Sequence, residues 1–535
     1  MLFQLSSDAG YLRCQRVSEW KNFLWEEKTM VKKLSVMALA GMLALPTFAM
    51  AAGGTDVTDL EKKINELSRQ LEELRGAMAA QSEQSKILAK NVEDLDSDVE
   101  DMDERSEEWD LSSRIKLNGD FRSRLDFYNA DRVFGKDLSN DTLFTNRFRL
   151  NMRVGITENV DFKGRLAMYK TWGNQSAFTD DSGAMYPLFD GNVTRSPIGD
   201  SALYVDRAFV NWNNIAGLPM WFSIGRRPTT DGPPAQMRMN SDERLATPMA
   251  FMDWPFDGIS AGYAWNWGAE SLGDSRVRLC YGRGFEAGLL DDDNEIKDTD
   301  FFGLSWDIMK KADRFAYVQS FMAFDLFNYP NFQDPIINDQ FGNMSGMGDR
   351  ENLGNIWHNS AVYQDKVDSL NYFISGGWSQ TRPTSGGMFN DPFSTTGKNT
   401  DNENGYSAYL GVRYDLEEAP LKFGAEFNYG SKYWLAMAPG NDDIYQSKLA
   451  TRGQVYEIYT IWDLPTGEKL SKYAKTFVRL GYQHYEYDYS GSGDWNMTPF
   501  DLSDDKAQLG MMNQMNGYDP VKRADQIYLT FEAYF

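Results

Sequence analysis

The stretch Gln526-Ile527-Tyr528-Leu529-Thr530-Phe531-Glu532-Ala533-Tyr534-Phe535 alternates strictly between two kinds of side chain and stops on an aromatic residue. One row is apolar and comprises Ile527, Leu529, Phe531, Ala533 and Phe535. The other row is mixed and polar, with Tyr528, Thr530, Glu532 and Tyr534. A period of two predicts a β-strand with one apolar face and one wet face.

The same alternation recurs where the strand-like part of the chain begins. Residues 115–127, 143–156 and 160–168 each set a continuous apolar row against a row rich in charged side chains. A soluble sandwich could contain one such strand. Three in series are hard to bury in any other way than with their apolar rows facing lipid.

The same pattern in the rest of the chain predicts thirteen further strands, for a total of about sixteen. They lie near residues 201–213, 219–229, 256–267, 275–284, 298–308, 313–327, 354–365, 370–381, 403–415, 420–434, 452–463, 474–489 and 523–535.

The connections between these segments alternate between short and long. The short ones are Thr157–Asn159, Asn214–Leu218, Met309–Ala312, Val367–Ser369 and Asp415–Ala419, and we expect the others to run to roughly twenty or thirty residues rich in Gly, Asn, Asp, Pro and Ser. Short periplasmic turns and long external loops are typical of outer-membrane barrels. Sixteen strands leave an aqueous channel, and an even number places both ends of the barrel domain, residues 111–535, in the periplasm.

An export signal precedes the strands. Met30 starts a short basic region, Leu34 to Leu45 is apolar, and Ala49-Met50-Ala51 supplies a small-residue cleavage site. Residues 30–51 are therefore predicted to be a secretory signal peptide rather than a membrane anchor, because the apolar run is too short to span a bilayer. Residues 1–29 have no place before such a signal, and we interpret them as an upstream extension from a misassigned start.

Composition excludes several classes of function. Cleavage would remove Cys14 and leave Cys280 alone, so neither a disulfide framework nor a thiolate metal site is expected. With only two histidines and no C-x-x-C-H motif, covalent haem is not expected either. A net charge of -24 argues against nucleic acid as a partner, because a phosphate-binding surface should be basic. The mean hydropathy of -0.53 does not exclude a barrel, since half of each strand is polar.

Residues 52–110 predict a long α-helical coiled coil. Apolar residues step by three and four in heptad register, with core positions at Val57, Leu60, Ile64, Leu67, Leu71, Leu74, Leu88, Val92, Leu95 and Val99. β-Branched residues at one core position with Leu at the other favour a dimer. Attachment to a barrel that assembles in threes would favour a trimer, so the oligomeric state stays open on the sequence alone.

Two features resemble a known class of protein. The final strand is similar to the closing strand of bacterial outer-membrane barrels, in which Ile527, Leu529, Phe531 and Phe535 would form the signal for the barrel assembly machinery. The pair Tyr204–Trp212 and Trp221–Pro228 resembles the central hairpin of bacterial porins, which leads into a loop that folds into the pore.

The whole chain after Ala52 is similar to an uncharacterised delta-proteobacterial porin family with an N-terminal periplasmic coiled coil. The resemblance implies an outer-membrane location in a Gram-negative bacterium, contact with lipid, and a homotrimer.

Candidate selectivity residues follow from strand parity. If the apolar rows face lipid, a ladder of basic side chains faces the lumen: Arg122, Arg124, Arg147, Arg149, Arg153, Lys163, Arg165, Arg227, Arg278 and, with weaker parity, Arg226. An arginine on the lipid face would cost about 2–4 kcal/mol at the midplane. The third external loop, from Thr229 to about Trp254, carries Asp231, Asp242 and Glu243, which would oppose the basic wall if the loop folds inward. The alternative is that the arginines merely solvate the wall or pair with lumen carboxylates such as Asp120, Asp161 and Glu426.

Other chemistry is weakly indicated. The acidic run Asp291–Glu295 offers hard oxygen ligands for Ca²⁺ but lacks the spacing of a defined calcium loop; no other metal or cofactor is expected. His358 and His484 lie on different predicted strands, and we see no nucleophile, base and acid set for an enzyme. Three functions stay open: a water-filled channel for passive diffusion of small hydrophilic solutes or ions, an envelope tether or spacer that uses the coiled coil and contacts the cell wall, and a barrel sheath around an electron-transfer partner.

Overall fold

The computed structural model describes residues 61–62, 64–73, 75–83, 86–87, 90–92, 114–135, 137–172, 203–227, 232–241, 256–288, 296–328, 351–438, 443, 447–471 and 473–535. The chain forms two compact units, Met1–Glu104 and Arg105–Phe535.

The described residues of the first unit are helical. Their apolar side chains at the predicted core positions are exposed to solvent: Ile64, Leu67, Leu71 and Val92. The other predicted core residues (Val57, Leu60, Leu74, Leu88, Leu95 and Val99) and the predicted signal peptide lie outside the described residues. Among the helices that the structure describes, none combines the length and the apolarity needed to cross a membrane.

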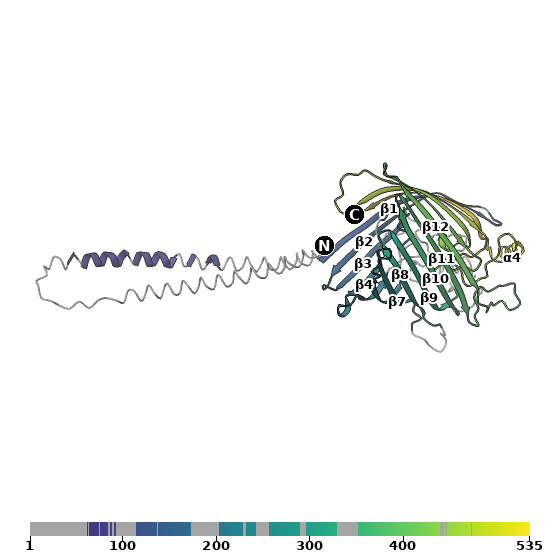
Figure 1. The fold of residues 1–535 in the computed structure, drawn as a ribbon, viewed down its shortest axis with the longest axis horizontal. Helices are drawn as coiled ribbons and strands as arrows, with labels where there is room; N and C mark the ends of the chain where they lie inside the picture. Colours follow the sequence, from purple (N-terminus) through teal and green to yellow (C-terminus); the bar gives the residue numbers. More distant parts are fainter. Residues whose placement is uncertain are drawn as a thin grey trace. The chain divides into compact units, whose positions relative to one another are not determined.

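The second unit is a closed antiparallel barrel of sixteen strands (Figure 1). Each of the sixteen predicted segments contains a strand, so the predicted barrel is confirmed. The strands are β1 Ile115–Arg132, β2 Leu138–Gly155, β3 Val160–Thr171, β4 Tyr204–Asn213, β5 Met220–Arg227, β6 Phe256–Asn266, β7 Asp274–Phe285, β8 Thr299–Lys311, β9 Arg314–Phe327, β10 Asn352–Val367, β11 Leu370–Pro383, β12 Asn404–Asp415, β13 Leu421–Gly430, β14 Gly453–Asp463, β15 Lys475–Tyr487 and β16 Val521–Tyr534.

The barrel closes through β1 and β16. In their register Leu125 faces Leu529 and Phe127 faces Ile527. The backbone N–H of Gly119 donates to the carbonyl of Phe535 at 2.9 Å, and the N–H of Phe535 donates back at 3.0 Å. Because β16 pairs with both β15 and β1, neither end of the sheet is left with an open edge.

Strand β16 shows how the period of two sorts side chains between the two faces. Ile527, Leu529 and Phe531 point outward and are 43–46% exposed, whereas the alternating Tyr528, Thr530 and Glu532 point inward and are at most 1% exposed. The same alternation on β1 exposes Leu117 and buries Arg122 and Arg124. A barrel that presents apolar rows outward and charges inward is suited to an apolar surrounding.

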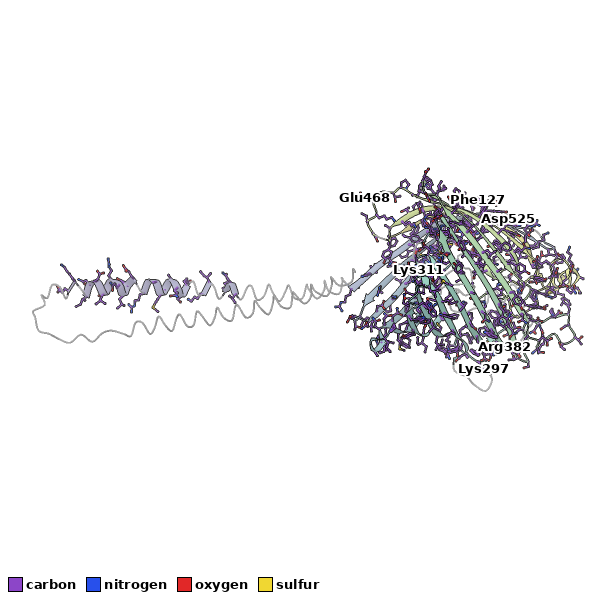
Figure 2. All side chains as sticks on the ribbon, in the orientation of Figure 1. Phe127, Lys297, Lys311, Arg382, Glu468 and Asp525 are labelled. Carbon is purple, nitrogen blue, oxygen red and sulfur yellow. The ribbon has the colours of Figure 1, made fainter. Side chains whose placement is uncertain are left out.

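The connections divide the barrel into two ends. We call one the turn end, formed by residues 156–159, 214–219, 267–273, 312–313, 368–369, 416–420 and 464–474, and the other the loop end. Figure 2 shows Lys311 and Glu468 toward the turn end and Lys297 and Arg382 toward the loop end. The first loop departs from the sequence expectation of a long connection, because β1 and β2 extend further than predicted and only residues 133–137 join them.

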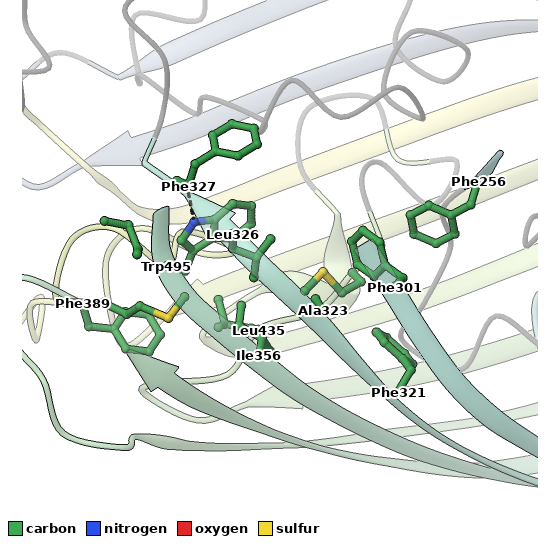
Figure 3. Packing of buried hydrophobic residues seen from close by; sticks show 13 residues of the cluster. Phe256, Phe301, Phe321, Ala323, Leu326, Phe327, Ile356, Phe389, Leu435 and Trp495 are labelled. Atoms are coloured by element: carbon green, nitrogen blue, oxygen red, sulfur yellow. Dashed lines mark hydrogen bonds between the residues drawn. The ribbon is translucent and has the colours of Figure 1, made fainter. Parts of the chain in front are cut away.

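Three connections at the loop end pack into the barrel. Met388 and Phe389 from residues 384–403, Leu435 from residues 431–452, and Trp495 from residues 488–520 form one buried apolar cluster with inward residues of β8, β9 and β10 (Figure 3). The indole N–H of Trp495 donates to the carbonyl of Phe327 at 2.9 Å. The described loops therefore cover part of the barrel interior at this end.

The last connection also crosses the closing seam. It contains helix α4, Lys506–Asn516, whose Leu509 and Met512 are buried against Tyr485 and Tyr487 of β15. Beyond α4, the Asp519 carboxylate accepts the backbone N–H of Phe134 at 2.9 Å. This contact ties the connection before β16 to the connection after β1.

Candidate functional site

Residues Gly232–Ser241, here called the inner segment, belong to the β5–β6 connection and lie against the inner wall of the barrel. Main-chain carbonyls of the inner segment accept hydrogen bonds from wall side chains: the Met237 carbonyl from Arg413 at 2.7 Å, and the Met239 carbonyl from Tyr534 at 3.0 Å. At its end, the Asn240 carbonyl accepts from Lys475 at 2.9 Å. These wall residues come from β12, β15 and β16, so a loop that starts after β5 reaches across to the far strands.

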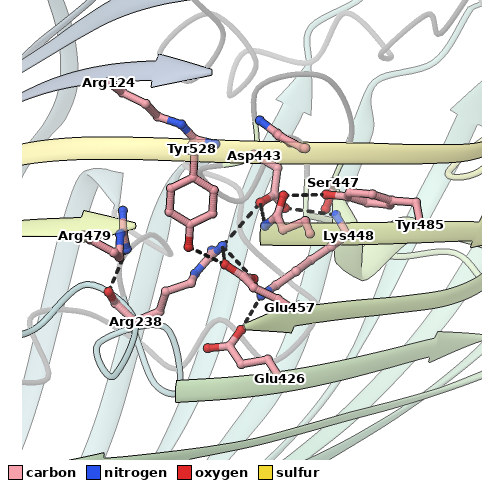
Figure 4. Close-up of polar contacts among 12 residues, drawn as sticks. Arg124, Arg238, Glu426, Asp443, Ser447, Lys448, Glu457, Arg479, Tyr485 and Tyr528 are labelled. Carbon is pink, nitrogen blue, oxygen red and sulfur yellow. Dashed lines mark hydrogen bonds and ion pairs between the residues drawn. The ribbon is translucent and has the colours of Figure 1, made fainter. Parts of the chain in front are cut away.

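Arg238 anchors the inner segment in a pocket of acidic side chains (Figure 4). Its Nη1 is 3.1 Å from a Glu457 carboxylate oxygen on β14 and 3.4 Å from Asp443 in the β13–β14 connection. Arg479 of β15 donates from Nη1 to the Arg238 carbonyl at 2.7 Å. All four side chains are at least 95% buried.

A second cation completes this acidic pocket. Lys448, from the β13–β14 connection, pairs with both Glu426 of β13 and Glu457, and it lies 2.5 Å from the latter. Tyr409 donates to Glu426 and Tyr528 donates to Glu457, each at 2.6 Å. The cluster thus sets two loop cations against three carboxylates, two of which come from the wall and one from a connection. We call Arg238, Glu426, Asp443, Lys448 and Glu457 the acidic anchor.

The electrostatics of the anchor differ between its loop residues. Burial by itself would lower the pKa of Arg238, but Glu457, Asp443 and Glu426 raise this pKa well above the ordinary value. Burial also raises the pKa of the Asp443 carboxyl, and the nearby Arg238 and Lys448 offset that rise only in part. Arg238 is therefore held as a cation, whereas the Asp443 carboxyl is protonated more easily than an ordinary aspartate.

The wall under the inner segment is flattened by aromatic rings that lie over glycines. A Cβ added to Gly424 would overlap the Tyr459 ring, and one added to Gly481 would overlap the Tyr528 ring. Arg124 stacks over Tyr528 with its Cζ 4.5 Å from the ring centroid. Glycine at these positions allows each ring to lie flat on the neighbouring strand.

The basic ladder on β1 and β2 is built differently from the acidic anchor. Arg147 and Arg149 both contact Asp120, at 2.9 and 2.8 Å, and Arg124 contacts Asp126 at 2.8 Å. The four ladder arginines Arg122, Arg124, Arg147 and Arg149 are at most 4% exposed. A carboxylate of the predicted kind, Asp120, therefore pairs with the ladder within the same two strands.

The remaining predicted basic residues lie on other strands or, for Arg153 of β2, at another height. Arg165 of β3 pairs with Asp206 of β4, and Arg278 of β7 lies 2.9 Å from Asp307 of β8. Arg153 and Lys163 are partly exposed and share Asp161, at 2.9 and 3.5 Å.

Two neighbouring arginines on β5 face opposite sides. Arg227 lies on the inner row, with its Cζ 5.6 Å from the centroid of the Trp221 ring. Arg226 is on the outer row with Phe222 and Ile224 and lies 3.4 Å from Asp257, so its inclusion among the lumen residues is corrected. Consecutive strand residues point to opposite faces, so only one of the pair can face inward.

Several predicted site residues cannot be compared with the structure. Asp231, Asp242, Glu243 and the acidic run at residues 291–295 lie outside the described residues. Within the residues that are described, no group of three or more His, Cys, Asp and Glu side chains is arranged to hold a metal ion. His358 is fully buried beside Phe321, and His484 lies 2.7 Å from Asp525.

Sequence reasoning missed most of the acidic anchor. Glu457 occupies the inward row of a predicted strand, so its parity could have identified it as a lumen residue. Arg238 and Lys448 lie in connections without periodicity, so no sequence pattern marks them.

Fold and interior together define a sixteen-stranded β-barrel with a charged inner wall and an inner segment docked on it. Residues 137–535 match the model of a family described as a protein of unknown function (DUF3373), so the chain belongs to this family. No curated protein sequence matches the chain.

Solved structures with a similar fold include three outer-membrane proteins. The outer-membrane expressed OmpT of Vibrio cholerae is 10% identical, with 79% of this chain and 97% of that chain covered and a TM-score of 0.38. The corresponding values are 8%, 79%, 99% and 0.38 for Salmonella typhi OmpF in complex with daunomycin. For the outer membrane channel DcaP of Acinetobacter baumannii they are 10%, 79%, 97% and 0.38.

Proposed function

We propose that the chain forms a channel in the outer membrane of a Gram-negative bacterium and lets small hydrophilic solutes or ions diffuse passively. The observation that carries this proposal is the inner segment, which is fixed to the inner wall of a closed barrel by the buried Arg238. A segment held inside a barrel narrows the passage through it and leaves the pairing of the strands unchanged. Rows of exposed apolar residues on the outside of the strands support insertion into lipid.

The charges of the interior set the expected selectivity. On β1 and β2 the four ladder arginines, Arg122, Arg124, Arg147 and Arg149, accompany two buried carboxylates, Asp120 and Asp126, so these two strands are basic in sum. The acidic anchor lies on the neighbouring part of the wall, beyond β16 and β15, and carries more carboxylates than cations. A solute passing along this part of the wall would meet charges of both signs close together, which favours polar and dipolar solutes over apolar ones.

Planar-bilayer recording of the purified full chain tests the channel. Stepwise conductance with a reversal potential that depends on the salt gradient is expected. The folded state of the sample is checked by the change of its gel mobility on heating. Absence of any conductance from protein shown to be folded in this way would contradict the proposal.

We further propose that residues 52–110 form a periplasmic coiled coil in a homotrimer, after export directed by residues 30–51. In support, Ile64, Leu67 and Leu71 recur at heptad spacing and are 57–62% exposed in the single chain, which leaves an apolar seam for identical helices to bury. Contact of this stalk with the cell wall is a further proposal. Chemical cross-linking followed by gel electrophoresis is expected to show a trimer for the full chain and a loss of it when Leu67 and Leu71 are both replaced by Asn.

We propose that Ile527, Leu529, Phe531 and Phe535 present the strand read by the barrel assembly machinery. The Phe535 ring packs where Gly119 has no side chain, since a Cβ there would lie 2.7 Å from the ring. Phe535→Asp is expected to reduce the heat-modifiable fraction in the outer membrane several-fold, with Phe535→Tyr as the matched control. Normal insertion of Phe535→Asp would contradict this role.

A further inference from the structure

A polar cavity of about 390 Å³ lies between the inner segment and the inner wall, near the turn end of the barrel. The inner segment contributes Gln236 and Met237, and the wall contributes Gln364 of β10 and Arg413 of β12. Lys366 and Asp313, from the turn-end parts of the wall, complete one side. Its volume is within the range of small-molecule sites.

One acceptor in this cavity has no partner. Gln236 is 6% exposed, and its Nε2 donates to the Gln364 side-chain oxygen at 2.7 Å. The Gln236 Oε1 is buried without a hydrogen bond in the described structure. A buried acceptor left alone is costly, so a ligand that brings an N–H or O–H donor would be favoured at this atom.

The deeper charges of the cavity are already neutralised by protein groups. Arg413 donates to both carboxylate oxygens of Asp415, at 2.7 and 3.0 Å. Asp365 lies 2.8 Å from Arg314. These groups therefore determine the shape of the cavity, and their charges are already paired within the protein.

Two charged side chains at the edge of the cavity, unlike Arg413 and Asp365, are not neutralised by an ion pair among the described residues. Lys366 and Asp313 are exposed, and neither forms an ion pair within the part of the chain that the structure describes. They offer one positive and one negative partner on the same side of the site. Bonds to such charged groups are stronger than bonds between neutral groups.

The lining also limits the class of ligand. Its described residues hold three cationic side chains, Lys310, Lys366 and Arg413, and three carboxylates, Asp313, Asp365 and Asp415, so together they carry no net charge. A simple anion or cation would gain little from a balanced site. Among the described lining residues there is no aromatic ring, so they offer no flat apolar platform for a sugar ring.

We propose that this cavity binds a small zwitterion, namely an α-amino acid or a dipeptide. The ligand ammonium would donate to Gln236 Oε1 and lie near Asp313, and its carboxylate would pair with Lys366. The inference rests on the proposed channel, since a solute would reach the cavity through the lumen. It adds the class of solute to the proposed function.

Saturation-transfer NMR on the detergent-solubilised full chain tests the site with three probes of similar size: L-alanine, propionate and ethylamine. A saturable signal is expected for L-alanine, with at least tenfold weaker binding of the two singly charged probes. Equal binding of all three probes, or no binding of L-alanine, would overturn the proposal.

Variants separate the site from its surroundings. Gln236→Met and Lys366→Gln are each expected to weaken L-alanine binding at least tenfold. Lys366→Gln leaves the inner segment untouched, so it tests the site even if Gln236→Met shifts that segment. Lys311→Gln, at the end of β8, and Asp368→Asn, on the β10–β11 turn, lie at the same end of the barrel and are matched controls that are expected to bind as the wild type does.

Conductance recorded on the same samples distinguishes the two proposals. L-alanine binding in detergent does not require conduction, so binding without conductance would contradict the channel and leave the site standing. Conductance with unchanged L-alanine binding in Lys366→Gln would overturn the site and leave the channel standing.

Discussion

Two parts of the inner wall carry buried charge in opposite ways. On β1 and β2 the arginines and their carboxylates come from the strands themselves, as in the contacts of Arg147 and Arg149 with Asp120. On β13 and β14 the wall supplies the carboxylates Glu426 and Glu457, and the cations Arg238 and Lys448 arrive from connections. The first wall is complete without the loops. The second is complete only when the loops dock on it, so it specifies where the inner segment lies.

This difference has an energetic basis. Replacing a buried ion pair by apolar groups is often neutral, whereas removing one partner and leaving the other costs about 3–5 kcal/mol. The acidic anchor therefore acts mainly to select one position for the inner segment. A loop placed elsewhere would leave Glu426 and Glu457 buried without their cations.

The largest effect is expected from Arg238→Met. This change leaves Glu457 and Asp443 with Lys448 as the one remaining cation of the anchor, and it should destabilise docking of the inner segment by roughly 3–5 kcal/mol. Hydrogen–deuterium exchange of residues 232–241 measures the docking and should become at least a hundredfold faster.

Arg382→Met is the matched control, because Arg382 is exposed on the outer row of β11 and stacks on Trp357 of β10. Its effect should stay below about 1 kcal/mol. If Arg238→Met exchanged no faster than this control, the acidic anchor would not hold the inner segment.

A smaller effect is expected from Asp120→Asn on the basic wall. Arg149 loses the carboxylate that it contacts at 2.8 Å, while Arg147 keeps Glu532 at 3.5 Å, so the loss of stability should be about 2–3 kcal/mol. The loss of one negative charge should shift the reversal potential toward anion preference. Exchange of residues 232–241 should not change, because this wall does not hold the inner segment.

Asp161→Asn provides the comparison for that measurement. Its partners Arg153 and Lys163 are exposed enough to be solvated, so its effect on stability should be under about 1 kcal/mol. A larger shift in reversal potential for Asp161→Asn than for Asp120→Asn would place the selective part of the passage near the turn end.

Gly424→Ala tests the flat wall below the inner segment. The added methyl overlaps the Tyr459 ring, which must move, at a cost of roughly 1–3 kcal/mol measured by urea unfolding in detergent. Gly376→Ala on β11 is the control, since its Cβ would meet nothing closer than the Ser407 carbonyl at 3.8 Å. Equal stability of the two variants would show that the ring has room to move.

The smallest effect concerns pH and Asp443. Its folded-state pKa is raised by burial above the unfolded value, so the folded protein binds this proton more tightly. Relative to Asp443→Asn, the wild type should gain stability as pH falls through the raised pKa, and lose that gain as pH rises through it. Unfolding midpoints of both proteins from neutral pH to about pH 4 measure the difference, and a gain in the opposite direction would contradict the raised pKa.

The sequence predicted the strands well because their signal is local. Alternation at residues 526–535 and at Ile115–Phe127 reports which face of each strand meets an apolar surrounding, and the structure agrees on all sixteen strands. The alternation of apolar and polar residues no longer marks a strand where the strand extends beyond its apolar outer row. Residues 128–132 of β1 and 138–142 of β2 are mostly polar, yet backbone pairing continues, so the first loop is shorter than expected.

The interior was predictable only in part. Parity placed Arg124 and Arg147 on the inner row, but it could not show that their carboxylate partners lie in the same strands. Docking of Arg238 depends on contacts with residues about two hundred positions away, which no local pattern reports.

Single-channel conductance of the wild type and of Arg238→Met, recorded in the same salt, tests most directly whether the docked inner segment sets the width of the passage. Stepwise openings are expected from both, with a clearly larger conductance in the variant because the inner segment no longer holds its place on the wall. Equal conductance in the two proteins, or none in either, would contradict the account.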